Sequence, residues 1–310
     1  MKALVARSYG PLEDLAVEDV PKPTPGPGTI LVRAEAVALN PADTVLITGA
    51  MRDALPVDHP FVPGIDISGV VEAVGENVTR FGVGDAIIAW NGVPSGALAE
   101  YVLVDDAPGT APRPAGLDTV RGAALPTGSL TAGSLLDTAN VLSGGTLLIV
   151  GASGGIGTYA IQLAKQAGIT VLGTGRLEDE EFVRRLGADH FIDYTRMKVA
   201  EEAHRMVPGG VDVVIDLARA GPALAGSAAA ARPGGLLVSP LGGPAAFDRD
   251  VAAAYVGITQ PPGRLDDFAA QAVDGRLRVE VATTYAFTDV RRAVVDFPTL
   301  HLRGKAVVIF

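Results

Sequence analysis

The sequence of 310 residues contains no cysteine. Disulfide bonds, thiolate nucleophiles and zinc sites built from cysteine are therefore all excluded. Histidine is scarce as well, and none of the four histidines has the spacing of a metal-binding motif. We expect each of them to be an ordinary surface or core residue. They are His59, His190, His204 and His301.

Positive charge and long apolar runs are also in short supply. The 25 lysines and arginines are outnumbered by 35 aspartates and glutamates, giving a formal net charge of −10. This charge repels nucleic acid and anionic lipid, so neither nucleic acid nor a membrane is expected as a partner. Apolar runs end at glycine, proline or charge before they reach spanning length, and Arg7 interrupts the N-terminal run early. The sequence predicts a cytoplasmic protein.

The remaining composition, with 48% hydrophobic residues, is that of a folded protein long enough for two domains. In the first third, apolar and polar residues alternate over 30–35 and 70–74, which is typical of half-buried strands, and the proline-rich segment 21–28 separates short elements. This pattern predicts a compact β barrel or sandwich.

From about Leu117 the pattern changes to apolar runs without alternation, separated by segments long enough for helices. Such runs indicate strands buried on both faces, as in a doubly wound parallel sheet. After Gly263 a mixed β pattern returns and is expected to pack on the first domain. We therefore predict an α/β protein with a β domain over 1–116 and 263–310 and a dinucleotide-binding domain over 117–262. The apolar runs are 146–150, 170–174, 190–194, 211–216 and 235–242.

A glycine-rich sequence, GASGGIG, follows the first of these runs directly and opens a segment with helical apolar spacing. It has the form A-x-G-x-x-G, in which backbone N–H groups approach a pyrophosphate at a helix N-terminus. A tight structural turn is the alternative, but the strand and helix around the loop favour a dinucleotide. The predicted cofactor-binding residues here are Ala152, Ser153, Gly154, Gly155, Ile156 and Gly157.

Several stretches in register, from MKALV at the start through VPGIDISGVVEAVG, the glycine loop, LGADHFIDY and GGVDVVID to the terminal RGKAVVIF, resemble the medium-chain dehydrogenase/reductase superfamily, and most of all its zinc-independent quinone oxidoreductases. The resemblance implies a GroES-like β domain, an inserted Rossmann domain and an active site in the cleft between them. Zinc-dependent relatives carry ligands where this chain has Asn40 and Asp66, and a four-cysteine lobe where it has the short connection 91–101. The resemblance therefore implies a reductase without metal that transfers a hydride from NAD(P)H to a quinone or an α,β-unsaturated carbonyl compound.

The resemblance also implies two catalytic residues, Asn40 and Asp43. The amide of Asn40 suits a substrate carbonyl or the nicotinamide, although Asn-Pro also forms turns. Asp43 is expected to orient the cleft as an ion-pair or capping residue. Some relatives carry a substrate-contacting tyrosine where this chain has Val45, so a proton donor at that place is excluded. Arg303 and Lys305 of the terminal RGK either lie near the cofactor cleft or form a solvated pair that flanks a strand.

The end of the second apolar run decides the expected cofactor. NAD-binding domains carry an acidic residue there for the ribose hydroxyls, whereas this chain has Thr174, Gly175 and Arg176. The guanidinium of Arg176 suits a 2′-phosphate, so we predict NADPH rather than NADH. The resemblance adds Tyr194 beside the adenosine phosphate. The alternative is that Arg176 pairs with the acidic cluster 178–181.

Two other functions stay open: a noncatalytic NADPH-binding protein, like the crystallins related to this family, and an enoyl reductase serving a synthase pathway. Substrate contacts are expected in the loops around 45–60, 90–96 and 240–265, which have no recognisable signature. The apolar segment 252–258 could form an outer strand that pairs with a second copy, so we predict a homodimer.

Overall fold

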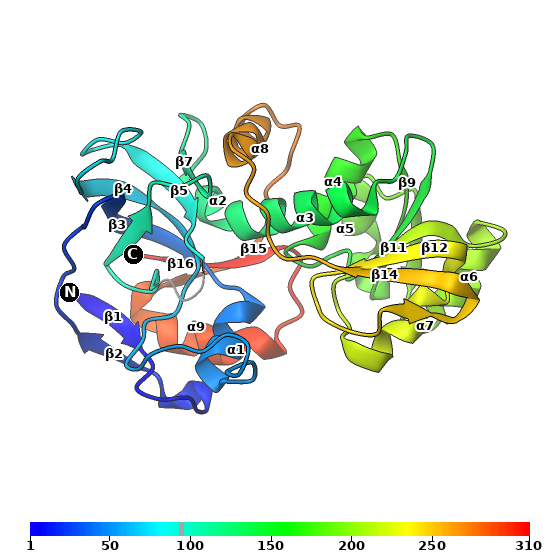
Figure 1. Cartoon of the computed structure of the whole chain (residues 1–310), viewed down its shortest axis with the longest axis horizontal. Helices are drawn as coiled ribbons and strands as arrows, with labels where there is room; N and C mark the ends of the chain where they lie inside the picture. The colour runs from blue at the N-terminus through cyan, green and yellow to red at the C-terminus, as the bar shows by residue number, and fades with distance from the viewer. Residues whose placement is uncertain (93–95) are drawn as a thin grey trace. The chain divides into compact units, whose positions relative to one another are not determined.

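The computed structural model describes residues 1–92 and 96–310, so the predicted connection 91–101 and the loop around 90–96 lie partly outside the described residues (Figure 1). The chain divides into two compact units. Unit 1 comprises Met1–Thr127, Gln260–Arg276 and Val281–Phe310, and unit 2 comprises Gly128–Thr259 and Leu277–Glu280. Relative to the predicted domains, residues 117–127 and 260–262 fall in unit 1 and residues 277–280 fall in unit 2.

Unit 1 contains a seven-stranded sheet in which β15, β16, β3, β4, β5 and β7 follow one another and β6 pairs with β3. A separate antiparallel pair joins β1 to β2. The strands are β1 (Lys2–Val5), β2 (Ala16–Asp19), β3 (Thr29–Ala38), β4 (Asp66–Val74), β5 (Ala86–Trp90), β6 (Tyr101–Asp105), β7 (Thr110–Pro112), β15 (Val281–Ala286) and β16 (Lys305–Ile309). Its helices are α1 (Pro41–Thr48), α2 (Thr119–Ala124), α8 (Arg264–Val273) and α9 (Val290–Asp296). The final segment therefore contributes strands to the same sheet as the first third, as predicted.

The helix α2 belongs to unit 1, where the side chain of Arg113 joins it to the sheet. One guanidinium nitrogen donates to Glu35 Oε2 at 2.9 Å, to Ser68 Oγ at 2.8 Å and to Thr119 Oγ1 at 2.8 Å. Gly122 of α2 lies so close to the sheet that an added Cβ would come within 2.9 Å of Ser68 Oγ. The residues just after 116 are therefore part of the β unit.

Unit 2 contains the predicted doubly wound sheet, with strand order β10-β9-β8-β11-β12-β14-β13. All pairs in it are parallel except that of β13 with β14. The strands are β8 (Thr146–Val150), β9 (Thr170–Gly175), β10 (His190–Asp193), β11 (Val211–Asp216), β12 (Ala231–Ser239), β13 (Ala246–Phe247) and β14 (Val251–Tyr255). The helices are α3 (Pro126–Ala139), which begins in unit 1, α4 (Gly157–Gln166), α5 (Glu180–Arg185), α6 (Val199–Met206) and α7 (Ala225–Ala228). The prediction of a parallel sheet is confirmed.

The segment expected as the outer strand is covered on its outer side over its first residues and lies at the sheet edge only from Ala254 onward. It forms β14 only as far as Tyr255, and β13 pairs antiparallel on its outer side. The chain reverses between the two strands because Arg249 and Asp250 adopt left-handed backbone angles, with φ of 63° and 59°. A short-range reversal of this kind has no hydrophobic pattern, and its only signal in the sequence is the polar stretch 248–250.

Two side chains of unit 2 hold the segments through which the chain leaves and re-enters it. The hydroxyl of Ser134 accepts from Thr259 N at 2.9 Å. Gln162 accepts from Arg278 N at 2.7 Å and donates to Arg278 O at 3.0 Å. Both segments are thereby fixed to helices α3 and α4. Among the described residues, no helix combines the length and the apolar character needed to cross a membrane.

Candidate active site

The glycine-rich loop of unit 2 connects β8 to α4 and runs against its own backbone. A Cβ on Gly157 would come within 2.3 Å of Gly151 O, closer than any real contact, so packing alone requires glycine there. The loop is also tied to the neighbouring strand, since Ala152 N donates to Thr174 O at 3.2 Å and Gly151 N donates to Thr174 Oγ1 at 3.2 Å. The predicted residues 152–157 and Thr174 are thus brought together.

Other features of the loop are explained by a ligand better than by packing. Gly154 has an ordinary backbone conformation, and a Cβ there would meet only Gly151 O, at 3.4 Å. Within the described chain, the N–H groups of Gly155 and Ile156 donate to no acceptor, and the buried hydroxyl of Thr158 has no partner. Glycine where packing does not need it, beside unsatisfied donors at a helix N-terminus, fits the pyrophosphate of a dinucleotide.

The ends of β9 and β10 place Arg176 and Tyr194 side by side. Asp193 pairs in register with Gly175, and Tyr194 N donates to Gly175 O at 3.2 Å. The side-chain hydrogen bond with Tyr194 is the main cause that raises the pKa of Arg176 above its ordinary value. Arg176 approaches Glu178 only at 4.0 Å. The guanidinium, half exposed, therefore interacts with Tyr194 and also with Glu178 of the acidic cluster.

The carboxylate of Asp179 is fully buried and serves the local structure. It accepts from Ser153 Oγ at 3.2 Å and from Arg176 N at 3.0 Å, so it fastens the glycine loop to the end of β9. Glu180, the next member of the acidic cluster, pairs with Arg184 one turn along α5 at 2.8 Å. Two of the four acids therefore have partners that leave the guanidinium of Arg176 accessible.

In unit 1 the two predicted catalytic residues form hydrogen bonds with their surroundings. The amide nitrogen of Asn40 donates to Ala38 O at 3.1 Å and to Asp66 Oδ2 at 3.0 Å, and its oxygen accepts from Lys305 Nζ. Asp43 accepts from Asn40 N at 2.8 Å through one oxygen and from Gly64 N at 2.9 Å through the other. Asp43 thus caps helix α1, and both donors of the Asn40 amide are engaged.

The centre of this group is Asp66, which is fully buried. Its first oxygen accepts from Thr127 N at 2.9 Å and from Thr127 Oγ1 at 2.6 Å, and its second accepts from Lys305 Nζ at 3.2 Å as well as from Asn40. Lys305 is only 5% exposed. The solvated pair considered for Lys305 is therefore wrong, because the side chain folds inward to this carboxylate. Its sequence signal was a lysine at the start of an apolar strand.

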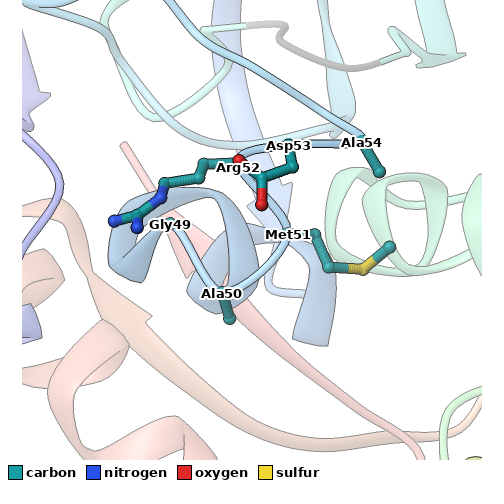
Figure 2. Close-up of a pocket in the computed structure, with 6 residues that line it drawn as sticks. All are labelled: Gly49, Ala50, Met51, Arg52, Asp53 and Ala54. Atoms are coloured by element: carbon teal, nitrogen blue, oxygen red, sulfur yellow. The ribbon is translucent and has the colours of Figure 1, made fainter.

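The turn that ends α1 lines a surface pocket of about 510 Å³, within the stretch 45–60 where substrate contacts were expected (Figure 2). All its lining residues come from this one turn, 49–54, and Figure 2 shows the side chains of Arg52 and Met51 pointing to opposite sides of it. Both side chains are exposed. The pocket offers no buried polar group, so it adds no chemistry to the site.

Two family models match the chain. One, described as an alcohol dehydrogenase GroES-like domain, covers residues 26–114, and the other, described as a zinc-binding dehydrogenase, covers residues 155–246. Among curated proteins, the chloroplast envelope quinone oxidoreductase homolog of Arabidopsis thaliana is 37% identical over 232 residues, which are 72% of this chain and 69% of that protein. The chain belongs to the medium-chain dehydrogenase/reductase superfamily. Within this superfamily it is quinone oxidoreductase-like, and its β unit is the GroES-like one.

Other members of the superfamily are also similar to this chain in sequence or in structure. The quinone oxidoreductase of Sus scrofa is 35% identical over 70% of this chain and 66% of that protein, so the alignments span about two thirds of these relatives. The solved quinone oxidoreductase of Coxiella burnetii superposes with a TM-score of 0.87 at 28% identity, over 100% of this chain and 99% of that one. A mycobacterial structure complexed with NADPH gives 0.87 at 26% over both whole chains, and the CurK enoyl reductase gives 0.86 at 25% over 99% and 98%.

One of the matching models is named for zinc, but the polar group around Asp66 does not fit a metal ion. The two positions at which zinc-dependent members of the superfamily were expected to carry ligands are Asn40 and Asp66. Here the ammonium of Lys305 forms hydrogen bonds with both. An ammonium between two oxygen donors already supplies the positive charge, and a second cation at the same place would be repelled.

The two loop glycines predict opposite effects of the same substitution. For Gly154→Ala we expect a thermal unfolding midpoint close to that of the wild type and at least a tenfold loss of NADPH affinity, because the new methyl group has room in the protein but not beside a pyrophosphate. For Gly157→Ala we expect a lower midpoint, because the methyl group meets Gly151 O. Calorimetric titration and thermal unfolding measure both. Wild-type affinity in Gly154→Ala would contradict the assignment of the loop.

The carboxyl of Asp43 predicts a pH dependence of stability. Burial, as the main cause, raises its pKa from 3.8 to about 7, against the opposing effect of its backbone hydrogen bonds; the charge of Asp66 raises it further and that of Lys305 lowers it. Between pH of about 4 and 7 the folded state retains a proton that the unfolded state has lost, so the free energy of unfolding falls as pH rises, by roughly 1 kcal/mol per pH unit.

Urea unfolding at several pH values between 5 and 8 tests this. We expect the wild type to lose stability with rising pH relative to Asp43→Asn, whose side chain does not titrate, and the difference to become constant above pH of about 7. Asp53→Asn, at an exposed position on the turn after α1, is the control and is expected to follow the wild type. Parallel curves for the wild type and Asp43→Asn would show that Asp43 does not titrate in this range.

Proposed function

We propose that this protein is an NADPH-dependent reductase of quinones and α,β-unsaturated carbonyl compounds that works without a metal. The observation that carries the proposal is the glycine loop with its unsatisfied N–H groups, next to an arginine where an NAD-binding domain has an acid. The names of the relatives and the NADPH complex of the mycobacterial neighbour support it. The chloroplast proteins among the relatives leave a cytoplasmic location a prediction.

In this proposal each unit has its own task. The N–H groups of Gly155 and Ile156 bind the pyrophosphate, and Arg176 with Tyr194 binds the 2′-phosphate through a charge-assisted, planar contact. Bound NADPH supplies the hydride. Asn40 and Asp43 fix the shape of the polar group in unit 1, since their own hydrogen bonds are made within it. The protein's contribution is thus alignment and a preorganised polar environment.

Turnover tests the function directly. NADPH oxidation by chelator-treated protein is measured against a panel of ortho- and para-quinones, enones and enoyl thioesters. We expect turnover with quinones or enones that the chelator does not reduce. Turnover confined to enoyl thioesters would favour the enoyl reductase alternative, which the structural similarity to the CurK enoyl reductase supports. Binding of NADPH without turnover of any acceptor would contradict the proposal and leave the crystallin-like alternative.

Cofactor choice is expected to depend on Arg176. Its substitution by alanine removes a charged hydrogen-bond donor, which is worth about 1.5 to 3 kcal/mol, or roughly 10- to 150-fold in kcat/KM for NADPH. We expect kcat/KM for NADH to stay unchanged, because NADH lacks the 2′-phosphate. Arg184→Ala, an exposed arginine of the same unit paired with Glu180, is the control. An unchanged preference would exclude Arg176 from the site, and a wild-type preference for NADH would contradict NADPH as the cofactor.

We further propose a homodimer formed through the edge of unit 2. The strand β13 pairs with only the first two residues of β14, and Ala253 N donates to Ala245 O at 3.0 Å, so within the described chain the outer edge of β14 has no partner from Ala254 onward. An apolar strand edge is stabilised by pairing with a second copy. Light scattering at micromolar concentration is expected to give the mass of a dimer. A monomer mass would contradict this pairing.

A further inference from the structure

We propose that Lys305 is the group that donates to the carbonyl oxygen of the acceptor and stabilises the negative charge that develops there. The inference rests on the proposed reductase function and adds the residue that takes the place of a metal. When a hydride and its electron pair form the new C–H bond at the β-carbon of an enone, the C=C electrons shift toward the carbonyl and the oxygen becomes an enolate. A proton from water then completes the reduction.

Lys305 suits this role because two hydrogen bonds fix its ammonium while one N–H donor stays available. An ammonium has three N–H donors. One donates to Asn40 Oδ1 and one to Asp66 Oδ2, while the third has no acceptor among the described residues. A buried donor without a partner costs about 1 to 3 kcal/mol, and a carbonyl oxygen of a ligand would satisfy it. The side chain is 5% exposed, whereas Asp66 behind it is not exposed at all.

Asp66 and Asn40, which accept hydrogen bonds from the ammonium, are themselves fixed by further hydrogen bonds. Asp66 accepts four hydrogen bonds, two of them from Thr127, so its second oxygen cannot turn away from Lys305. The amide of Asn40 directs its oxygen to the ammonium because both of its N–H groups are engaged elsewhere. A cation fixed in advance stabilises a developing oxyanion without the cost of reorganisation. Asn40 itself has no free donor to offer, which is why the role falls to Lys305.

A purely structural role explains this group less well. Replacing a buried ion pair by apolar residues of similar volume is often neutral or stabilising, so burial of Lys305 and Asp66 is weak evidence for stability. Two carboxyl groups lie near the ammonium: Asp66, in direct contact, and Asp43, whose oxygens face the backbone of Asn40 and Gly64. The ammonium of Lys305 thus keeps one N–H group for which the described residues supply no acceptor.

The test compares Lys305→Met, which keeps the length of the side chain and removes the charge, with Lys305→Arg and with Lys198→Met, an exposed control. We expect Lys305→Met to keep NADPH affinity within about threefold and to lose roughly 10²- to 10³-fold in kcat with enones. The loss should shrink along a series of acceptors of increasing electrophilicity, because these need less stabilisation of the oxyanion. Lys305→Arg should recover part of kcat.

The outcomes separate the two proposals. A wild type that reduces no acceptor contradicts the proposed function. An active wild type with unchanged kcat in Lys305→Met, or with the same loss for every acceptor, contradicts only the role of Lys305. If Lys305→Met does not fold, inhibition of the wild-type enzyme tests the role of Lys305 instead. Substituted phenols that ionise near the working pH imitate the enolate when they are deprotonated. We expect the phenolate forms to inhibit at least tenfold better than the neutral forms. Equal inhibition by both forms would overturn the inference.

Discussion

A buried carboxylate is costly unless hydrogen-bond donors and a positive charge surround it, and Asp66 of unit 1 is such a group. Its donors come from segments 26, 61 and 239 positions away in the sequence. They are Asn40 before α1, Thr127 at the start of α3 and Lys305 at the start of β16. The first and the last thirds of the chain therefore share one sheet and are also joined by the buried ion pair of Asp66 with Lys305.

Unit 2 depends on a different constraint, the close approach of backbone to backbone. Gly157 against Gly151, and the buried carboxylate of Asp179 between Ser153 and Arg176, set the shape of the loop and the end of β9 together. The same local arrangement leaves the N–H groups of Gly155 and Ile156 without acceptors among the described residues and the side chain of Arg176 half exposed. A bound phosphorylated dinucleotide would accept hydrogen bonds from these N–H groups and from the arginine. Gly154, which packing does not require, is therefore explained by function rather than by folding.

Sequence patterns sufficed for features built from neighbouring residues. The loop 151–157 and Arg176 were found because a strand, a turn and a helix follow one another, and the parallel sheet was found because its strands are apolar on both faces. The buried orientation of the Lys305 side chain had no such local signal, since its partners Asn40 and Asp66 are far away in the sequence. The engaged amide of Asn40 and the strand β13 were unpredictable for the same reason: side-chain orientation and a reversal at Arg249 depend on tertiary contacts.

The proposed function requires that a hydride pass directly from the nicotinamide cofactor to the acceptor. NADPH carrying deuterium on the transferred position of C4, incubated with an enone and the chelator-treated protein in ordinary water, tests it most directly by mass spectrometry of the product. We expect one deuterium on the β-carbon of the saturated ketone and a proton from water on the α-carbon. A product without deuterium on the β-carbon would contradict it.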